Sequence, residues 1–249
     1  MSLIVNKRCL VIYLEGTIGC GKSTLINAIK TKLSLQTDIK CMYFPEPVSD
    51  WKPYLEMAQK DSKMTAFLQT TVMSHYALVR ATIRHQIERS KQVCLFVVER
   101  SVYSAWSVFS QDLSDFDKKL VESIMKKIMR SWPLKDVIFH VFFLTGEISV
   151  ILDRVKQRNR HYEQQHAKVY VELYHKYEKF MSDFSIVKQN KIAIEEAINE
   201  QVNLVLKIIS SYKHFGSIGN LVKHTVNLQL IKKMTTDVCE CEIMNQNML

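Results

Sequence analysis

The chain has 249 residues, of which 47% are apolar and 24% are charged, a composition typical of a globular protein with a sizeable buried core. Its 6 glycines and 4 prolines exclude collagen-like, proline-rich and glycine-rich linker segments. The net charge of +9 favours anionic partners such as nucleotides, nucleic acid or acidic membranes, although a basic solvated surface is the simpler explanation of the charge alone.

Short apolar runs alternate with amphipathic stretches along most of the chain. Buried strands are expected at 8–14, 39–44, 93–98, 137–144 and 184–187. Helices are expected at 22–33, 51–89, 101–131, 147–158, 166–182 and 194–211, with two helices in each of the second and third stretches. Because strands that alternate with helices form crossover connections, the pattern predicts an α/β fold around a parallel sheet.

The sequence changes character near Ser210, where a polar connection begins. We therefore expect one domain over residues 1–212 and a C-terminal extension over 213–249 of undefined structure. The longest apolar run, 137–144, is much shorter than a membrane span. The 6 cysteines include no C-x-x-C pair, which is typical of a reducing compartment. The expectation is a cytoplasmic protein that binds neither membrane nor nucleic acid.

A phosphate-binding loop follows the first predicted strand and opens the first predicted helix. The pattern G-x-x-x-x-G-K-[ST] is met by Gly16, Thr17, Ile18, Gly19, Cys20, Gly21, Lys22 and Ser23, and Thr24 continues it. Backbone N–H groups of such a loop surround phosphate oxygens, with the helix N-terminus behind them. Lys22 is expected to reach the β- and γ-phosphates, and Ser23 to bind Mg²⁺. The motif predicts a P-loop NTPase-type three-layer α/β/α fold with a central five-stranded parallel sheet, but leaves the reaction open.

Two carboxylates follow predicted parallel strands at the edge of the sheet where ligands bind. Glu46 begins the sequence Glu-Pro-Val, and Glu99 precedes Arg100 and Ser101. Either segment alone is as readily a strand-ending turn or a helix cap. The guanine-specific N-K-x-D motif of GTPases is missing, since its nearest match at Asn190 lacks the Asp. The joint position of both carboxylates behind a P-loop indicates a catalytic site.

An arginine cluster lies on and after the helix expected at 147–158. Arg154 and Arg158 are four residues apart and share a helix face, and Arg160 follows in the loop. Taken alone, the cluster is equally well interpreted as a solvated basic helix face. Behind a phosphate site, however, the cluster predicts a helical lid whose guanidinium groups stabilise the transferring phosphoryl group.

These segments together resemble the deoxyribonucleoside kinases, a family that includes the insect multisubstrate enzyme, mitochondrial thymidine kinase and deoxycytidine kinase. The segments are 15–24, Glu-Pro-Val at 46–48, Glu-Arg-Ser-Val-Tyr-Ser-Ala at 99–105 and the arginines of the lid, and the order agrees over roughly residues 8–210. The resemblance implies phosphorylation of the 5′-hydroxyl of a deoxyribonucleoside in nucleotide salvage. It also implies ATP and Mg²⁺ as cofactors and a homodimer formed by paired helices.

The resemblance also implies roles for individual side chains. Glu46 matches the general base, Arg100 holds the 5′-hydroxyl and positions Glu46, and Glu99 joins Ser23 in supporting Mg²⁺. Catalytic roles fall on Glu46, Arg100, Lys22, Arg154, Arg158 and Arg160. Substrate-binding roles fall on Glu46, Trp51, Gln59, Gln69, Tyr76, Arg100, Ala105, Phe109 and Glu163, with Gln69 reading the base, Trp51 and Phe109 flanking it, and Glu163 reaching the 3′-hydroxyl.

Base preference is expected to depend on two positions of this pocket. Ala105 and Tyr76 stand where purine- and cytosine-preferring members carry Asp and Arg. A buried Asp would need a donor on the base, and the methyl group of thymine offers none. The uncharged pocket predicts a thymidine kinase-like pyrimidine preference, for thymidine and/or deoxycytidine. Tyr76 also differs from the methionine of thymidine-accepting members. A pocket narrowed by Tyr76 is therefore the alternative expectation.

One position departs from the family pattern, and two rival functions remain. Gln59 stands where the family has a tyrosine that contacts the 3′-hydroxyl. Either Gln59 or Tyr54 takes over this contact, or sugar selectivity is looser.

A thymidylate-type nucleoside monophosphate kinase shares the P-loop and the lid but needs a cationic site for the phosphate of its substrate. A non-catalytic P-loop regulator is disfavoured because Lys22, Glu46 and Arg100 are all present.

Overall fold

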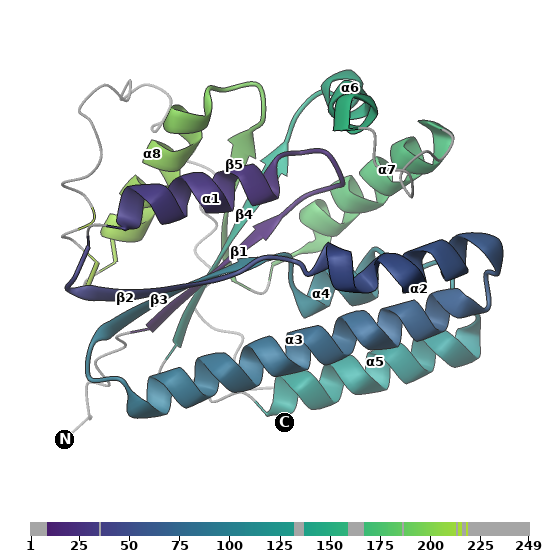
Figure 1. Cartoon of the computed structure of the whole chain (residues 1–249), viewed down its shortest axis with the longest axis horizontal. Helices are drawn as coiled ribbons and strands as arrows, with labels where there is room; N and C mark the ends of the chain where they lie inside the picture. Colours follow the sequence, from purple (N-terminus) through teal and green to yellow (C-terminus); the bar gives the residue numbers. More distant parts are fainter. Residues whose placement is uncertain are drawn as a thin grey trace.

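The computed structural model describes residues 9–34, 36–131, 137–158, 167–185, 187–212, 214, 215 and 218. Five parallel strands form one sheet in the order β2-β3-β1-β4-β5 (Figure 1). The strands are β1 (Cys9–Glu15), β2 (Ile39–Phe44), β3 (Val93–Glu99), β4 (Val137–Thr145) and β5 (Lys188–Ala193). The predicted α/β fold with a central five-stranded parallel sheet is confirmed.

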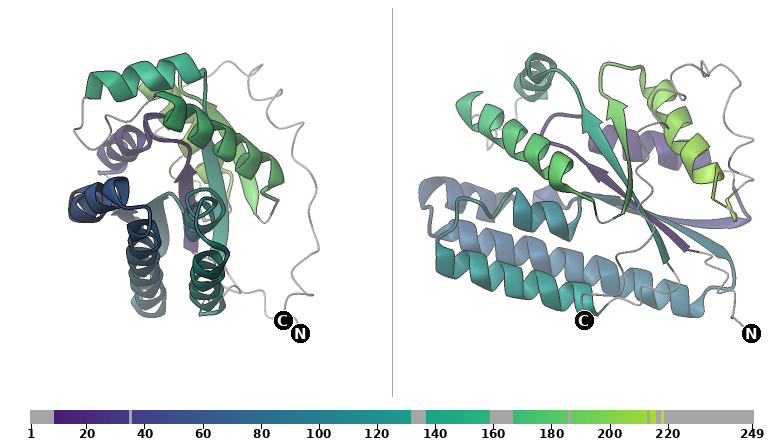
Figure 2. Two further views of the ribbon diagram at one scale, coloured as in Figure 1. Left: turned by 90° about the vertical axis from the view of Figure 1, so that its right-hand side faces the viewer. Right: turned by 180° about the vertical axis from the view of Figure 1, so that it is seen from behind.

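Helices cover both faces of this sheet (Figure 2). They are α1 (Lys22–Leu33), α2 (Val48–Lys60), α3 (Met64–Arg89), α4 (Val102–Ser107), α5 (Asp115–Arg130), α6 (Ile148–Arg158), α7 (Ala167–Asp183) and α8 (Ile198–Ser210). Buried side chains of α1, α6 and α8 form one core cluster, and those of α2, α3, α4, α5 and α7 form the other. None of the described helices is long and apolar enough to cross a bilayer.

The central strand β1 shows why the sheet has two cores. Its side chains alternate, so Leu10, Ile12 and Leu14 enter the α1 and α8 core while Val11 and Tyr13 enter the opposite core. A strand that is buried on both faces reads as a continuous apolar run, as the segment 9–14 does. Because β1 is the central strand, its C-terminal end, where the P-loop begins, lies at the middle of the sheet.

The fifth strand was predicted at the wrong position. Phe184, where the strand was expected to begin, is instead buried in the core against Phe143 and Phe180. The strand is Lys188–Ala193, a polar segment whose exposed residues are tolerated because β5 is the edge of the sheet. The last helix consequently begins at Ile198, later than the predicted 194.

The expected C-terminal extension lies almost entirely outside the described residues. Phe215 and Ile218 are described, and both are buried in the core beside α1 and α8. Tyr212 precedes them and its hydroxyl lies 2.7 Å from His140 Nδ1 on β4. The domain boundary at 212 stays a prediction.

Candidate functional site

A cleft of about 1270 Å³ opens at the C-terminal edge of the sheet. Its walls come from the P-loop, the segments that follow β2 and β3, and helices α2, α3, α6 and α7. Ligands bind at this edge in open α/β folds, where the strand order reverses between neighbouring connections. Most of the predicted site residues that the structure describes therefore line one cleft, although they lie far apart in the chain.

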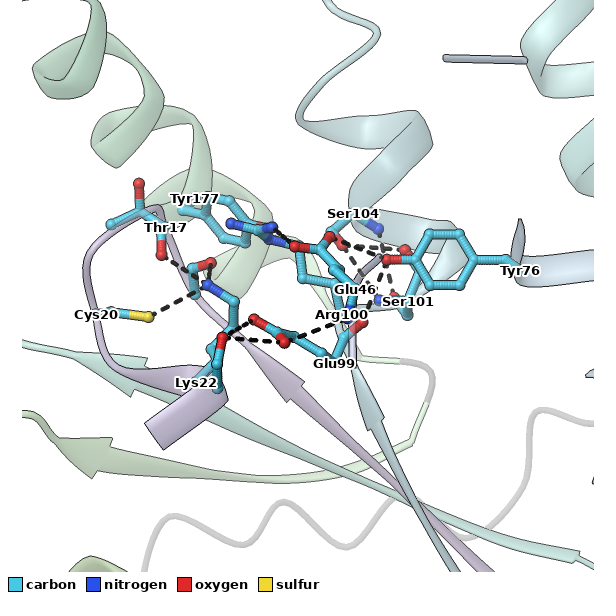
Figure 3. Close-up of polar contacts among 12 residues, drawn as sticks. Thr17, Cys20, Lys22, Glu46, Tyr76, Glu99, Arg100, Ser101, Ser104 and Tyr177 are labelled. Carbon is cyan, nitrogen blue, oxygen red and sulfur yellow. Dashed lines mark hydrogen bonds and ion pairs between the residues drawn. The ribbon is translucent and has the colours of Figure 1, made fainter. Parts of the chain in front are cut away.

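Glycine backbone conformations and hydrogen bonds from Lys22 set the shape of the P-loop. Gly21 has φ +98°, which is the left-handed conformation that directs the chain into α1. A Cβ on Gly19 would approach Val155 Cγ2 to 2.7 Å, so α6 packs directly on the loop. Lys22 Nζ donates to the carbonyls of Gly16 at 3.0 Å and Thr17 at 2.8 Å (Figure 3). The ammonium group thus lies inside the loop, among the groups that bind phosphate in such motifs.

Glu99 connects the P-loop to the end of β2. Ser23 Oγ donates to Glu99 Oε1 at 2.9 Å, and the backbone N of Glu46 donates to Glu99 Oε2 at 3.3 Å. Hydroxyl and carboxylate oxygens are the ligand types that suit Mg²⁺. The two groups predicted to support the metal are therefore adjacent and fit it chemically.

Glu46 and Arg100 form a buried ion pair at the centre of the cleft. Their side chains are 7% and 8% exposed, and Arg100 Nη1 donates to Glu46 Oε2 (Figure 3). Arg100 Nε donates to the Tyr177 hydroxyl at 2.7 Å. Burial disfavours the charge of Arg100, but Glu46, Tyr177 and Glu99 outweigh it, so the pKa of Arg100 lies well above its usual range. The guanidinium is a fixed positive charge that holds the carboxylate in place.

Arg100 has a strained backbone, with φ 58° in the left-handed region. Its backbone N donates to Leu14 O at 2.9 Å, which ties the turn after β3 to the central strand. The turn leads into α4, whose N-terminus carries a capping box between Ser101 and Ser104. A strained residue between a strand and a capped helix is typical of a functional site.

Tyr76 joins the base pocket to the carboxylates. Its hydroxyl lies 3.4 Å from Glu46 Oε1 and 3.3 Å from Glu99 O, and its side chain is buried. Burial and the neighbouring Glu46 raise the pKa of Tyr76 well above its usual range, so the hydroxyl stays protonated and donates. The expected substrate residue is thus also in contact with the expected base.

The residues expected to surround the nucleoside base line the same cleft. Trp51, Gln69, Ala105 and Phe109 all contribute to its wall, and Gln69 and Ala105 are only 5% and 2% exposed. Within the described part of the chain, Gln69 Oε1 is buried without a hydrogen-bond partner. Gln59 also lines the cleft but is exposed, at the rim rather than the floor. The side chains at Trp51, Ala105 and Phe109 are apolar or aromatic, and the buried Gln69 amide can hydrogen-bond a base.

Glu15 is a further buried carboxyl directly before the P-loop. It is 1% exposed, and burial raises its pKa from 4.5 to about 7, against the lowering influence of Ser101, Ser104, Arg100 and Lys22. A carboxyl in such surroundings exchanges its proton near neutral pH.

The arginine cluster is described in part. Arg154 Nη2 donates to Ile194 O at 2.8 Å, and Arg154 and Arg158 both line the cleft. Arg160 and Glu163 lie outside the described residues.

Several cleft residues were missed from the sequence. Tyr170 and Tyr177 of α7, and Glu196 and Gln201 beyond β5, line the cleft or contact Arg100. Tyr170, Tyr177 and Phe180 are spaced as one helix face, and such an aromatic face resembles an ordinary core stripe. The spacing gave no signal that a tyrosine hydroxyl contacts an arginine from another segment.

Comparisons with known proteins agree with this arrangement. The profile of the family described as deoxynucleoside kinase matches residues 12–216. The chain is 29% identical over 196 residues to a deoxyadenosine/deoxycytidine kinase of Bacillus subtilis, covering 75% of this chain and 83% of the relative. It is 28% identical over 166 residues to a deoxyadenosine kinase of Lactobacillus acidophilus, covering 62% and 69%.

A solved structure has the same fold. It is a deoxyadenosine kinase from M. mycoides with dCMP and dCDP bound, matched with a TM-score of 0.60 at 20% identity over 81% of this chain and all of that one. Since the family profile covers most of the residues, the chain belongs to the deoxynucleoside kinase family, whose members phosphorylate deoxynucleosides with a nucleotide phosphate donor.

Proposed function

We propose that this protein transfers the γ-phosphoryl group of ATP to the 5′-hydroxyl of a deoxyribonucleoside, with a preference for pyrimidines, in nucleotide salvage. The observation that carries the proposal is the buried pair of Glu46 and Arg100, which shares one cleft with the P-loop lysine Lys22. A base next to a triphosphate site is the arrangement that phosphorylation of an alcohol requires.

The phosphate donor belongs in the P-loop half of the cleft. Lys22 and the backbone N–H groups of the loop bind the β- and γ-phosphates, and Arg154 and Arg158 approach from α6. Ser23 and Glu99 would hold Mg²⁺, which neutralises charge on the phosphates when bound. Arg160 is proposed to join the other lid arginines.

The acceptor belongs in the other half of the cleft. Glu46 accepts the proton of the 5′-hydroxyl as the phosphoryl group arrives, because the carboxylate is fixed by Arg100 and receives the Tyr76 hydroxyl. Arg100 pairs with the Glu46 carboxylate and has further N–H groups for the 5′-oxygen. Glu163 is proposed to reach the 3′-hydroxyl, with Gln59 at the rim in place of the tyrosine of other members.

The base pocket supports a pyrimidine preference. Phe109 and Trp51 offer aromatic faces, and the Gln69 amide has a donor and an acceptor that serve either thymine or cytosine. Ala105 adds no charge that would need a donor on the base, so thymidine is accepted. Of the relatives, one is named for deoxyadenosine and deoxycytidine and the other for deoxyadenosine. Deoxycytidine is the acceptor that this pocket and the first relative share.

A homodimer through α3 and α5 is part of the proposal. These helices pack side by side, and their outer faces expose Leu78, Phe116 and Leu120, which are 67%, 78% and 44% exposed. A dimer formed through these helices would cover such exposed apolar side chains. Sedimentation of wild type and of Leu78→Glu tests this, with a dimer expected for wild type and a monomer for the variant. Within the described residues the thiols of Cys20, Cys41 and Cys94 form no disulfide, which suits the proposed reducing cytoplasm.

The reaction is tested by identifying the product. The protein is incubated with γ-labelled ATP, Mg²⁺ and thymidine, and the labelled product is digested with a 5′-nucleotidase. Release of the label as phosphate supports transfer to the 5′-oxygen, and a resistant product contradicts it. In a parallel reaction thymidine monophosphate replaces thymidine, and labelling of the monophosphate alone would favour the monophosphate kinase.

A further inference from the structure

We propose that Tyr177 is a positioning residue for phosphoryl transfer, because its hydroxyl fixes the Arg100 guanidinium that in turn holds Glu46. The inference rests on the proposed function, because it takes Arg100 and Glu46 as the groups that act on the 5′-hydroxyl. Tyr177 itself touches Arg100 and not the reacting atoms. Tyr177 lies on α7, far in sequence from the strand that carries Arg100, and Figure 3 shows both side chains meeting beside Glu46.

The contacts fix two different edges of the guanidinium. Arg100 Nε donates to the Tyr177 hydroxyl at 2.7 Å, and Nη1 donates to Glu46 Oε2. One bond alone would leave the planar group free to pivot about its partner. Two bonds at separate nitrogens set its plane, so the N–H groups that remain point in a defined direction.

Two aromatic rings also lie close to the same group. The Arg100 guanidinium carbon lies 5.0 Å from the centre of the Phe109 ring and 5.9 Å from that of Tyr177. The two rings meet edge to face at 5.9 Å. Phe109 lines the nucleoside part of the cleft, so Tyr177 supports both Arg100 and the ring against which the base is proposed to stack.

The surroundings make this hydrogen bond strong. Tyr177 is 5% exposed, and burial raises the pKa of its hydroxyl well above the usual range, although Arg100 lowers it. The neutral hydroxyl is therefore present at all working pH values and accepts from a charged donor away from water. Charge-assisted hydrogen bonds in such places contribute more than neutral ones.

The test compares two tyrosine variants of the same helix. Tyr177→Phe removes the acceptor of Arg100, while the control Tyr174→Phe removes a hydroxyl that donates to Gly146 O at 3.1 Å. Loss of a hydrogen bond to a charged group predicts a drop of kcat by about 10-fold for Tyr177→Phe, with the KM for ATP unchanged. The control keeps its kcat, and thermal unfolding of both variants shows that each is folded.

A double-mutant cycle separates positioning from packing. Arg100→Lys keeps the charge beside Glu46 but has no Nε to reach Tyr177. If Tyr177 acts through Arg100, then Tyr177→Phe lowers kcat and nucleoside affinity in the wild type and has little further effect in the Arg100→Lys background. Affinity measured by calorimetry gives the same cycle even where turnover is too slow to follow.

The result that overturns the inference is additivity, with Tyr177→Phe costing the same in both backgrounds, or equal losses in Tyr177→Phe and Tyr174→Phe. Failure of the proposed function looks different, because wild type itself would then phosphorylate no deoxynucleoside.

Discussion

The two halves of the cleft are built in opposite ways. The phosphate half is built around one continuous segment, the P-loop and the start of α1, which supplies backbone atoms and Lys22 and is joined by Glu99, Arg154 and Arg158. The nucleoside half comes from α2, α3, α4 and α7, and its groups are side chains. Phosphate recognition is thus a property of a local motif, and base recognition depends on how distant helices pack.

Glu46 and Arg100 lie on the border between the halves. Glu46 contacts Glu99 through its backbone and Arg100 through its carboxylate, so a single residue touches both sites. This difference predicts that substitutions in the phosphate half lower kcat/KM by the same factor for every acceptor. Substitutions in the nucleoside half should instead change the order of kcat/KM among acceptors.

The largest effect is expected at the border. Glu46→Gln keeps the shape of the side chain but removes the proton acceptor, so kcat should fall by roughly 10²–10⁴-fold for every acceptor. ATP affinity, measured by calorimetry, should stay near that of wild type. Glu88→Gln, an exposed change on α3, is the matched control. Unchanged turnover in Glu46→Gln would mean that another group acts as the base.

A smaller effect is expected in the phosphate half. Lys22→Met removes the buried ammonium that lies inside the P-loop and should lower kcat by roughly 10²–10³-fold, the usual loss for one preorganised charge-stabilising donor. The ratios of kcat/KM between acceptors should not move. Lys30→Met, on the exposed side of α1, controls for loss of charge. A changed order of acceptors in Lys22→Met would break the division into halves.

The nucleoside half is tested by a selective change. Ala105→Asp places a carboxylate at a position that is 2% exposed, and should lower kcat/KM for thymidine by about 10-fold relative to deoxycytidine, which offers an amino donor. Ala105→Asn has similar size without the charge and separates crowding from electrostatics. Equal losses for all bases would show that Ala105 does not face the base.

The smallest effect concerns stability and pH. The folded-state pKa of Glu15 is about 7 against an ordinary 4.5, so its contribution to stability is present below pH 4.5 and is lost as pH rises through about 7. Glu15→Gln removes this loss and should raise the free energy of unfolding above pH 7 by at most about 3 kcal/mol. Denaturant unfolding across this range checks it, with the exposed Glu200→Gln as control. If the free energy of unfolding of wild type does not fall relative to that of Glu15→Gln as pH rises, the raised pKa of Glu15 is contradicted.

The contrast between a local motif and packed distant helices also explains which features could be predicted from the sequence. The P-loop, Glu46 and Glu99 could be located because each follows an apolar strand that ends at one edge of the sheet. The strand β5 was misplaced because an edge strand is polar, while the aromatic Phe184 that resembled a strand packs in the core. The contact between Tyr177 and Arg100 joins two segments whose pairing depends on tertiary packing, and no spacing within either segment encodes it.

The most direct test of the account is one panel of acceptors with ATP and Mg²⁺, with kcat/KM measured for thymidine, deoxycytidine, deoxyadenosine, deoxyguanosine, uridine and thymidine monophosphate. An uncharged Ala105 beside the buried Gln69 amide predicts that thymidine or deoxycytidine leads, and Glu46 as base for a 5′-hydroxyl predicts that the monophosphate is not used. Turnover led by a purine deoxynucleoside would contradict the assignment of the base pocket. Turnover of the monophosphate alone would contradict the role of Glu46 as a base for a 5′-hydroxyl.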